Sequence, residues 1–215
     1  MSAPRSVPWL AVFVALGFSA AGPPAASAAC VTPSASVVVT SSEQAVVTVE
    51  RHQTGRDVDQ ASTSTWRGCL QAVGQQLEIE RGSSSFSTLR SAEAFRLAGP
   101  FAAYRLLDGG KSGSSTSVLL LDLRDGGRFS TPVIDTNDSS RFDYTSHAVN
   151  PAGDLAWIRL GVSAGRRRWT VFARVDGVTR ELARSRRALS RVRLSPTRAT
   201  WHQAGRKTVR RAALR

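Results

Sequence analysis

Apolar residues along this chain occur in short runs and do not follow the spacing of a helix. Runs such as "ASVVVT" and "QAVVTVE" alternate with stretches rich in Gly, Asp, Asn, Ser and Pro. No convincing segment of about twelve or more residues carries apolar side chains at i, i+3, i+4 and i+7. Short β-branched runs between turn-forming residues are typical of strands. The pattern therefore predicts an all-β protein.

A pair of such runs recurs along the sequence. Each of the segments "FRLAGPFAAYRLL", "HAVNPAGDLAWIRL" and "VRLSPTRATWHQ" reads as a strand, a tight turn and a second strand. The second strand carries an aromatic residue, which is Tyr104, Trp157 or Trp201. An earlier segment that starts at Val37 has the same shape without the aromatic residue. The sequence thus predicts a repeated hairpin.

A second hairpin follows each of the first three pairs. Its turns are predicted at Val73-Gly74, Asp125-Gly126-Gly127 and Asp176-Gly177, because Asp-Gly supplies the positive φ angles of tight hairpin turns. The repeating unit is then four antiparallel strands, with units at about 36–92, 93–146, 147–189 and 190–215, and the fourth unit stops before its last strand.

The length of this unit is typical of β-propeller blades. Tyr104 and Trp157 are 53 residues apart, and Trp157 and Trp201 are 44 apart, close to the roughly 40–50 residues of a four-stranded blade. The run "VLLLDL", from Val118 to Leu123, has apolar residues at both odd and even positions, which point to opposite faces of a strand. This indicates a strand covered on both faces. We expect a small or incomplete propeller of about three and a half units, with a two-sheet β-sandwich as the alternative.

The repeated turn, alanine and aromatic residue, followed by a hairpin such as "VLLLDLRDGG", resembles secreted bacterial WD40-like or TolB-like propeller proteins. The resemblance covers about residues 36–215 and rests on packing and turn residues. It implies a propeller-like fold and binding to another protein. The chain lacks the Gly-His and Trp-Asp pairs of true WD40 blades.

The N-terminal residues 1–29 have the anatomy of a secretory signal peptide. Arg5 precedes an apolar run of about fourteen residues, and small residues follow at the positions required for cleavage. The remaining domain, 30–215, contains no further segment that could span a membrane. Cys30 and Cys69 form an even pair in an oxidising compartment, which predicts one disulfide. The expected location is outside the cell or in the cell envelope.

Positive charge is concentrated near the C-terminus. The formal net charge is +13, and the segment 166–215 holds 15 Arg and one Lys against Asp176 and Glu181. A concentrated positive field attracts polyanions, although an arginine-rich composition alone also produces such a surface. The candidate residues for polyanion binding are Arg166, Arg167, Arg168, Arg186, Arg187, Arg191, Arg193, Arg206, Lys207, Arg210 and Arg211.

Three short strings imitate catalytic or metal-binding motifs. "GVSAG" (161–165) matches a nucleophile elbow, but a strand follows it where a helix is required. "GGKSGSS" (109–115) lacks the first glycine of a phosphate loop. "DTNDSSRFD" (135–143) offers oxygen donors to calcium but lacks the glycine and glutamate of an EF-hand. His52, His147 and His202 are interpreted as surface or packing residues. We expect no catalytic residue, metal or cofactor.

These patterns favour a non-enzymatic binding or scaffold module. Its partner is expected to be another protein or an anionic envelope polymer. One alternative is a polyanion-binding protein that uses the Arg-rich C-terminal face. Another is a hydrolase or lyase on a propeller frame, which requires acidic side chains that converge in a pocket or Ser163 close to His202.

Overall fold

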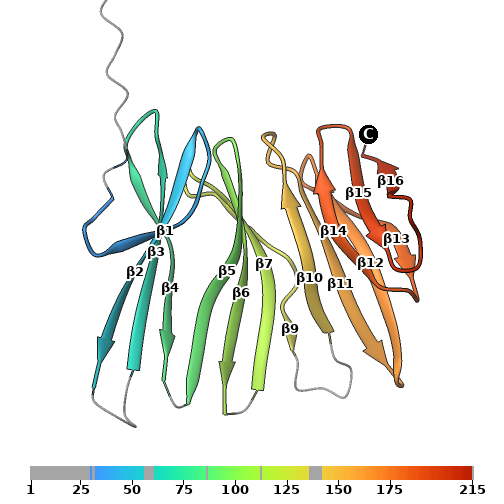
Figure 1. Ribbon diagram of the computed structural model, residues 1–215, viewed down its shortest axis with the longest axis horizontal. Helices are drawn as coiled ribbons and strands as arrows, with labels where there is room; N and C mark the ends of the chain where they lie inside the picture. Colours follow the sequence, from blue (N-terminus) through green and yellow to red (C-terminus); the bar gives the residue numbers. More distant parts are fainter. Residues whose placement is uncertain are drawn as a thin grey trace, which may run out of the picture.

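A computed structural model of the chain describes Cys30 and residues 32–55, 61–85, 87–111, 113–135 and 142–214 (Figure 1). The predicted signal peptide, residues 1–29, lies outside the described residues. The elements are β1 (Ser36–Ser41), β2 (Ala45–Thr54), β3 (Ala61–Leu70), β4 (Gln76–Ser84), β5 (Thr88–Ala98), β6 (Phe101–Gly110), β7 (Gly113–Asp122), β8 (Arg128–Ser130), β9 (Ile134–Asp135), β10 (Phe142–Val149), β11 (Leu155–Ser163), β12 (Arg166–Val175), β13 (Val178–Ser185), β14 (Leu189–Leu194), β15 (Arg198–Gln203) and β16 (Arg210–Ala213).

The prediction of an all-β protein is confirmed, since every element in the described part of the chain is a strand. The strands pair antiparallel in three sheets, and none of these sheets is closed. The first sheet runs from β1 to β8 in chain order, with β9 beside β7; the second is β10 to β13, and the third β14 to β16. Each strand therefore pairs mainly with its neighbour in the chain.

The nine-stranded sheet folds over at the junction of β4 and β5. These two strands pair through Ser83 with Arg90 and Ser84 with Leu89, near their connection. Beyond this point the β1–β4 part faces the β5–β7 part across a shared core. The molecule is consequently a stack of four sheet layers, β1–β4, β5–β9, β10–β13 and β14–β16 (Figure 1).

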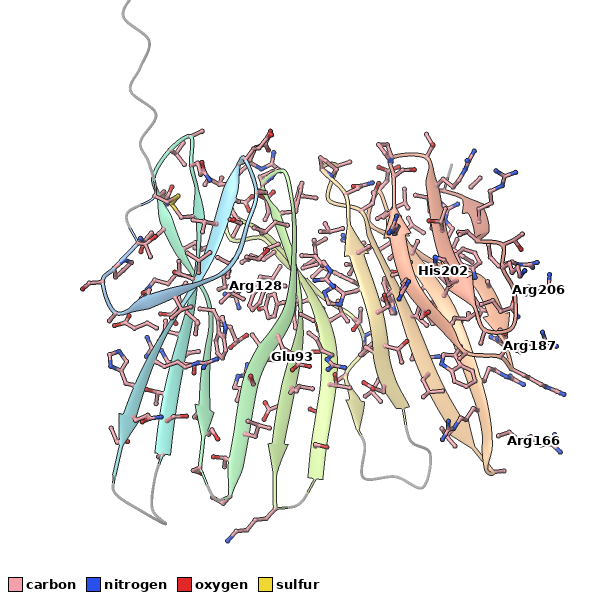
Figure 2. The ribbon with its side chains drawn as sticks, in the orientation of Figure 1. Glu93, Arg128, Arg166, Arg187, His202 and Arg206 are labelled. Atoms are coloured by element: carbon pink, nitrogen blue, oxygen red, sulfur yellow. A yellow bond between two sulfur atoms is a disulfide. The ribbon has the colours of Figure 1, made fainter. Side chains whose placement is uncertain are left out.

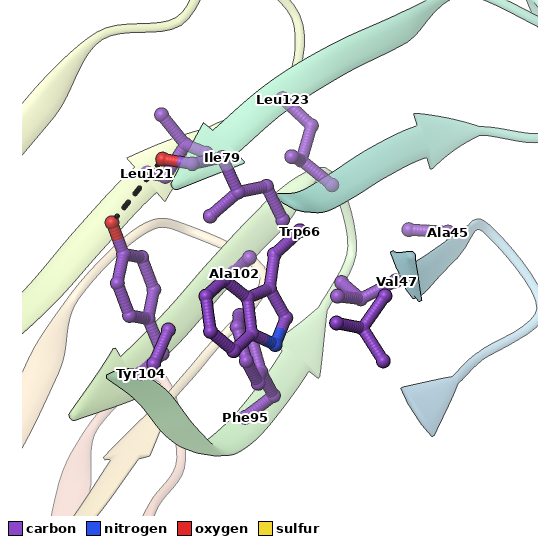
Figure 3. Packing of buried hydrophobic residues seen from close by; sticks show 11 residues of the cluster. Ala45, Val47, Trp66, Ile79, Phe95, Ala102, Tyr104, Leu121 and Leu123 are labelled. Carbon is purple, nitrogen blue, oxygen red and sulfur yellow. Dashed lines mark hydrogen bonds between the residues drawn. The ribbon is translucent and has the colours of Figure 1, made fainter. Parts of the chain in front are cut away.

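One apolar cluster fills the space between each pair of neighbouring layers. The first cluster joins Val47, Trp66 and Ile79 of the first layer to Phe95 and Tyr104 of the second (Figure 3). Phe95 and Tyr104 stack with their ring centroids 5.1 Å apart. The other two clusters join the second layer to the third and the third to the fourth. Each inner layer is thus covered on both faces.

Strand β7 and the residue after it illustrate this double burial. Leu121 and Leu123 pack into the first cluster, whereas Val118 and Leu120 pack into the cluster between the second and third layers. Successive side chains of a strand point to opposite faces, so a strand between two cores needs apolar residues at both parities. The run from Val118 to Leu123 has this pattern for that reason.

The three aromatic residues of the repeated hairpin have equivalent surroundings. Tyr104, Trp157 and Trp201 lie on β6, β11 and β15, the second strands of their layers. Each belongs to the cluster that its layer shares with the preceding layer. The recurring aromatic residue therefore serves the same packing contact each time.

The turn between the first two strands of each layer is fixed by one recurring hydrogen bond. The residue that follows the third strand donates its backbone N–H to that turn in all four layers. The bonds run from Gln71 to the Gln44 carbonyl (2.9 Å), from Leu123 to the Pro100 carbonyl (2.9 Å), from Asp176 to Oδ1 of Asp154 (3.3 Å) and from Leu214 to the Thr197 carbonyl (3.0 Å). The four layers thus share local geometry as well as strand order.

Cys30, which precedes β1, is attached to the first layer. Cys30 and Cys69 form a disulfide, as predicted from the pair of cysteines. Strand β1 pairs with β2 and does not join the fourth layer. Within the described ranges, no helix is long and apolar enough to cross a membrane. The disulfide is compatible with an extracytoplasmic protein.

Candidate anion-binding site

Arginines gather where β11, β12 and β13 lie side by side in the third layer. Arg159 is directly opposite Thr170, and Thr170 is directly opposite Arg184. Two residues further along the same face, Gly161 is opposite Arg168. Because alternate residues of a strand share a face, these side chains form two adjacent rows on one surface.

These rows line a cavity of about 380 Å³. Its size falls in the range of small-molecule sites, roughly 300–1,000 Å³. Gly161 and Thr170 contribute the two uncharged positions. The full lining is Arg159, Gly161, Arg166, Arg167, Arg168, Thr170, Arg184 and Arg186.

The turn between β11 and β12 brings three of these arginines to the cavity. Ala164 and Gly165 have φ angles of 48° and 72°, as a two-residue hairpin turn requires. Ser163 then pairs with Arg166, and β12 begins with Arg166, Arg167 and Arg168. The string "GVSAG" is therefore a strand end and a hairpin turn, as expected, and not a nucleophile elbow.

The charge around the cavity is strongly positive. Six of the eight lining residues are arginines, and the lining contains no Asp or Glu from the described part of the chain. Glu181 binds Arg184 from outside the lining, with Oε1 3.0 Å from Nε and Oε2 2.6 Å from Nη2. This hydrogen bond and the nearby negative charge raise the pKa of the Arg184 guanidinium. An arginine side chain stays charged at physiological pH in any case.

Two of the guanidinium groups are held in place. That of Arg159 lies over the ring of Phe172, 5.0 Å from its centroid, which is within cation–π distance. Phe172 in turn stacks on Trp157, with centroids 5.5 Å apart. Arg184 is held by the two contacts with Glu181. Two of the six cavity arginines thus have partners that restrict their positions.

A bend after β13 connects the cavity to a second basic segment. Ser185 Oγ accepts hydrogen bonds from the Arg187 backbone N–H (2.9 Å) and from Gln203 Nε2 (3.1 Å). A Cβ atom at Gly205 would lie 3.4 Å from Arg187 Nη1. Figure 2 shows Arg166, Arg187 and Arg206 along the same outer edge of the molecule. We call Arg187, Arg206 and Lys207 the basic rim.

The predicted basic residues divide into three groups. Arg166, Arg167, Arg168 and Arg186 line the cavity, and the basic rim lies beside it. Arg191, Arg193, Arg210 and Arg211 are exposed on β14 and β16 and do not line the cavity. Sequence reasoning missed Arg159 and Arg184, although pairing the "DLAWIRL" and "RRRWTVFARV" runs around Ala164-Gly165 places Arg159 opposite Thr170.

A second cavity, of about 360 Å³, lies near the turns of the second and third layers. Four aspartates line it together with Arg128 and Arg174, namely Asp122, Asp125, Asp154 and Asp176. Asp122 binds the Arg124 guanidinium, and this hydrogen bond lowers the pKa of Asp122. Asp125 and Asp154 accept hydrogen bonds from backbone N–H groups of turns. These contacts of the three carboxylates stabilise turns.

The histidines have separate roles. His52 is exposed and contacts Glu50 at 3.0 Å, and His202 is partly buried on β15. His147 is buried between the second and third layers, and its Nε2 has no hydrogen-bond partner in the described part of the chain. Burial lowers the pKa of His147 to about 4, and the positive charge of Arg96 acts in the same direction.

The remaining motifs give no chemical site in the described residues. In "GGKSGSS", Gly109 and Gly110 end β6, and Gly113, Ser114 and Ser115 begin β7. Residues 136–141 of "DTNDSSRFD", and the side chain of Ser163, lie outside what the structure describes. Across the described ranges, no group of three or more His, Cys, Asp and Glu side chains is placed to hold a metal ion.

Comparisons with protein-family models, with curated proteins and with solved structures find no match for this chain.

Proposed function

We propose that this chain is an exported, propeller-like binding module that holds an anionic polymer of the cell envelope or the extracellular space. The recurring turn hydrogen bond and the equivalent packing of Tyr104, Trp157 and Trp201 support a repeated, blade-like unit. The disulfide supports an oxidising compartment. The role is non-enzymatic.

The observation that carries the binding function is the arginine-lined cavity with the basic rim beside it. Six arginines surround one cavity whose described lining lacks acidic residues. The bend at Ser185 then continues the positive surface toward Arg206. A linear polyanion gains affinity by placing several charged groups on such a surface and releasing counterions. The surface of a protein partner is chemically varied, so a uniformly positive surface matches it less well than it matches a polyanion.

The test is the salt dependence of binding to a model polyanion. Single-stranded DNA serves as a phosphodiester polymer and polyglutamate as a carboxylate polymer, both titrated into the purified protein at several salt concentrations. We expect the logarithm of the DNA association constant to fall linearly with the logarithm of the salt concentration, with a slope of about −0.7 for each phosphate contacted. Binding that is absent at low salt, or that does not change with salt, contradicts the proposal.

Two double variants with the same net charge distinguish binding at the basic rim from a general attraction of polyanions to a positively charged protein. Replacing Arg187 and Arg206 with Gln removes two charges from the basic rim. The control replaces Arg51 on β2 and Arg81 on β4 with Gln, which removes two charges from the first layer. Both residues are exposed. We expect the rim variant to bind DNA more weakly and with a less steep dependence on salt. In the control, affinity and salt dependence should change only as far as the loss of two net charges implies.

A further inference from the structure

The basic rim lies along an outer edge of the molecule, whereas the cavity is a hollow lined from three strands. The geometry of the cavity indicates a ligand that is more closely defined than a general polyanion. Neighbouring strands lie about 4.8 Å apart, so the backbones of Arg159 and Arg184, on either side of β12, are about 10 Å apart. Arg168 lies two residues from Thr170 along β12, which is about 7 Å. Guanidinium groups therefore reach the cavity from three adjacent strands around the buried Thr170.

The volume exceeds what one phosphate or sulfate ion fills. About 380 Å³ equals the liquid volume of roughly a dozen water molecules. The oxygens of a single tetrahedral ion lie close together, so such an ion would leave most of this volume unfilled. A chain of linked tetrahedral groups fills more of the cavity and presents anionic oxygens to arginines on more of the three strands.

Charge points to phosphoryl groups. Each guanidinium presents a planar fork of N–H donors that matches two oxygens of either a carboxylate or a phosphoryl group, but a terminal phosphoryl group carries about −1.5 to −2 charge at neutral pH, more than a carboxylate carries. Six such forks line the cavity; Glu181 engages that of Arg184, and that of Arg159 lies over the ring of Phe172. Before any ligand binds, Phe172 restricts the side chain of Arg159 and Glu181 restricts that of Arg184. This reduces the conformational entropy that these side chains lose on binding.

We infer that this cavity binds a ligand with two or more linked phosphoryl groups, an oligophosphate. The inference rests on the proposed function, since it assigns one recognition element within the same basic region. The oligophosphate is either a free molecule or the end group of a polymer that continues along the basic rim. Both sources share the same phosphoryl chemistry at the cavity.

Calorimetric titration with four small anions tests the inference. Tripolyphosphate, pyrophosphate, orthophosphate and citrate are each titrated into the protein at fixed ionic strength. We expect one tripolyphosphate per chain, with affinity falling from tripolyphosphate to pyrophosphate to orthophosphate. Citrate is expected to bind at least about tenfold more weakly than tripolyphosphate, because it carries less negative charge at neutral pH. Equal binding of citrate and tripolyphosphate, more than one site per chain, or no saturable binding overturns the inference.

Variants of one exposed arginine locate the binding. Arg168→Gln is expected to weaken tripolyphosphate binding about tenfold or more, since it removes charge-assisted hydrogen bonds. Arg168→Lys keeps the charge but loses the fork, so its affinity should lie between those of the wild type and Arg168→Gln. Arg51→Gln loses the same charge at an exposed position on β2, in the first layer, and should stay within about twofold of the wild type. Equal losses in Arg168→Gln and Arg51→Gln would also overturn the inference.

The two proposals fail in different ways. If DNA binds with a steep salt slope but tripolyphosphate does not bind, the cavity inference fails and the polymer function stands. If tripolyphosphate binds one to one but no polymer binds, the polymer function fails. An oligonucleotide with a 5′-triphosphate that binds more tightly than both free tripolyphosphate and the unphosphorylated oligonucleotide identifies an end group as the ligand. Equal affinity of that oligonucleotide and free tripolyphosphate identifies a free molecule.

Discussion

Asn150 donates a hydrogen bond from Nδ2 to Oδ2 of Asp154 over 2.9 Å, and both residues are buried in the turn between β10 and β11. Oδ1 of Asn150 also accepts from the backbone N–H groups of Ala152 and Asp154, each at 3.0 Å. Nδ2 reaches the Ser195 carbonyl at 3.5 Å, in the corresponding turn of the fourth layer. One amide side chain therefore closes its own turn and contacts the next one.

Replacing Asn150 with Ala is expected to destabilise the fold by about 3 kcal/mol, because buried groups of Asp154 and of the turn backbone lose their partners. Urea unfolding measures the change. Pro151→Ala is a suitable control, since Pro151 is exposed in the same turn and its replacement should cost much less. A loss of stability in Asn150→Ala as small as that in Pro151→Ala would show that the turn tolerates the missing amide.

The regular part of this fold was predictable from local sequence. β-branched and aromatic runs marked the long strands, and Asp176-Gly177 marked a hairpin whose two residues have φ angles of 50° and 80°. The apolar run from Val118 to Leu123 indicated a strand covered on both faces, because burial on two sides removes the alternation of apolar and polar residues. These signals act over a few residues, so a single sequence contains them.

The rest depends on register and on contacts between distant segments. The two-residue strand β9 pairs with Ser115 and Thr116 of β7, and so short a run has no periodicity. Arg159 and Arg184 join the cavity only through their alignment with Thr170. His147 lies between Ser146 and Ala148 in the sequence, where nothing local marks it as buried, and its burial follows from the second layer that packs over it. The candidate site was therefore predicted as a basic region, but not as a cavity.

Gly82 is a position where any side chain would collide with the core. A Cβ atom there would lie 2.2 Å from the Arg90 carbonyl oxygen and 2.7 Å from Cζ3 of Trp66. Because the first contact is with backbone, relief requires β4 and β5 to separate. We expect Gly82→Ala to cost about 3 kcal/mol, at the upper end of the usual overpacking penalty.

Gly109→Ala provides the matched control on β6. Its nearest contact would be the Ser114 Cβ at 3.4 Å, which is ordinary van der Waals distance. The change should therefore stay within about 0.5 kcal/mol. Thermal unfolding of the two single variants makes the comparison, and equal midpoints would contradict the packing found at Gly82.

The disulfide between Cys30 and Cys69 ties the chain start to β3. Replacing both cysteines with Ser should lower the free energy of unfolding by about 2–4 kcal/mol, mainly through greater freedom of the unfolded chain. A reducing agent should lower the wild-type stability by a similar amount and leave the double variant unchanged. A wild-type protein that unfolds at the same urea concentration with and without reductant would argue against any stabilising role.

His147 should make the stability depend on pH below neutrality. Its folded-state pKa of about 4 is lower than the ordinary value of 6.5, so the unfolded chain binds more protons between these values. Stability from the neutral imidazole is fully present above pH 6.5, falls as the pH decreases, and is lost once the pH passes below about 4. The total loss is about 3 kcal/mol. His147→Leu should flatten this part of the pH profile in urea unfolding. A wild-type slope that persists in His147→Leu would assign the acid sensitivity to the carboxylates instead, since those also lose their ion pairs as the pH falls.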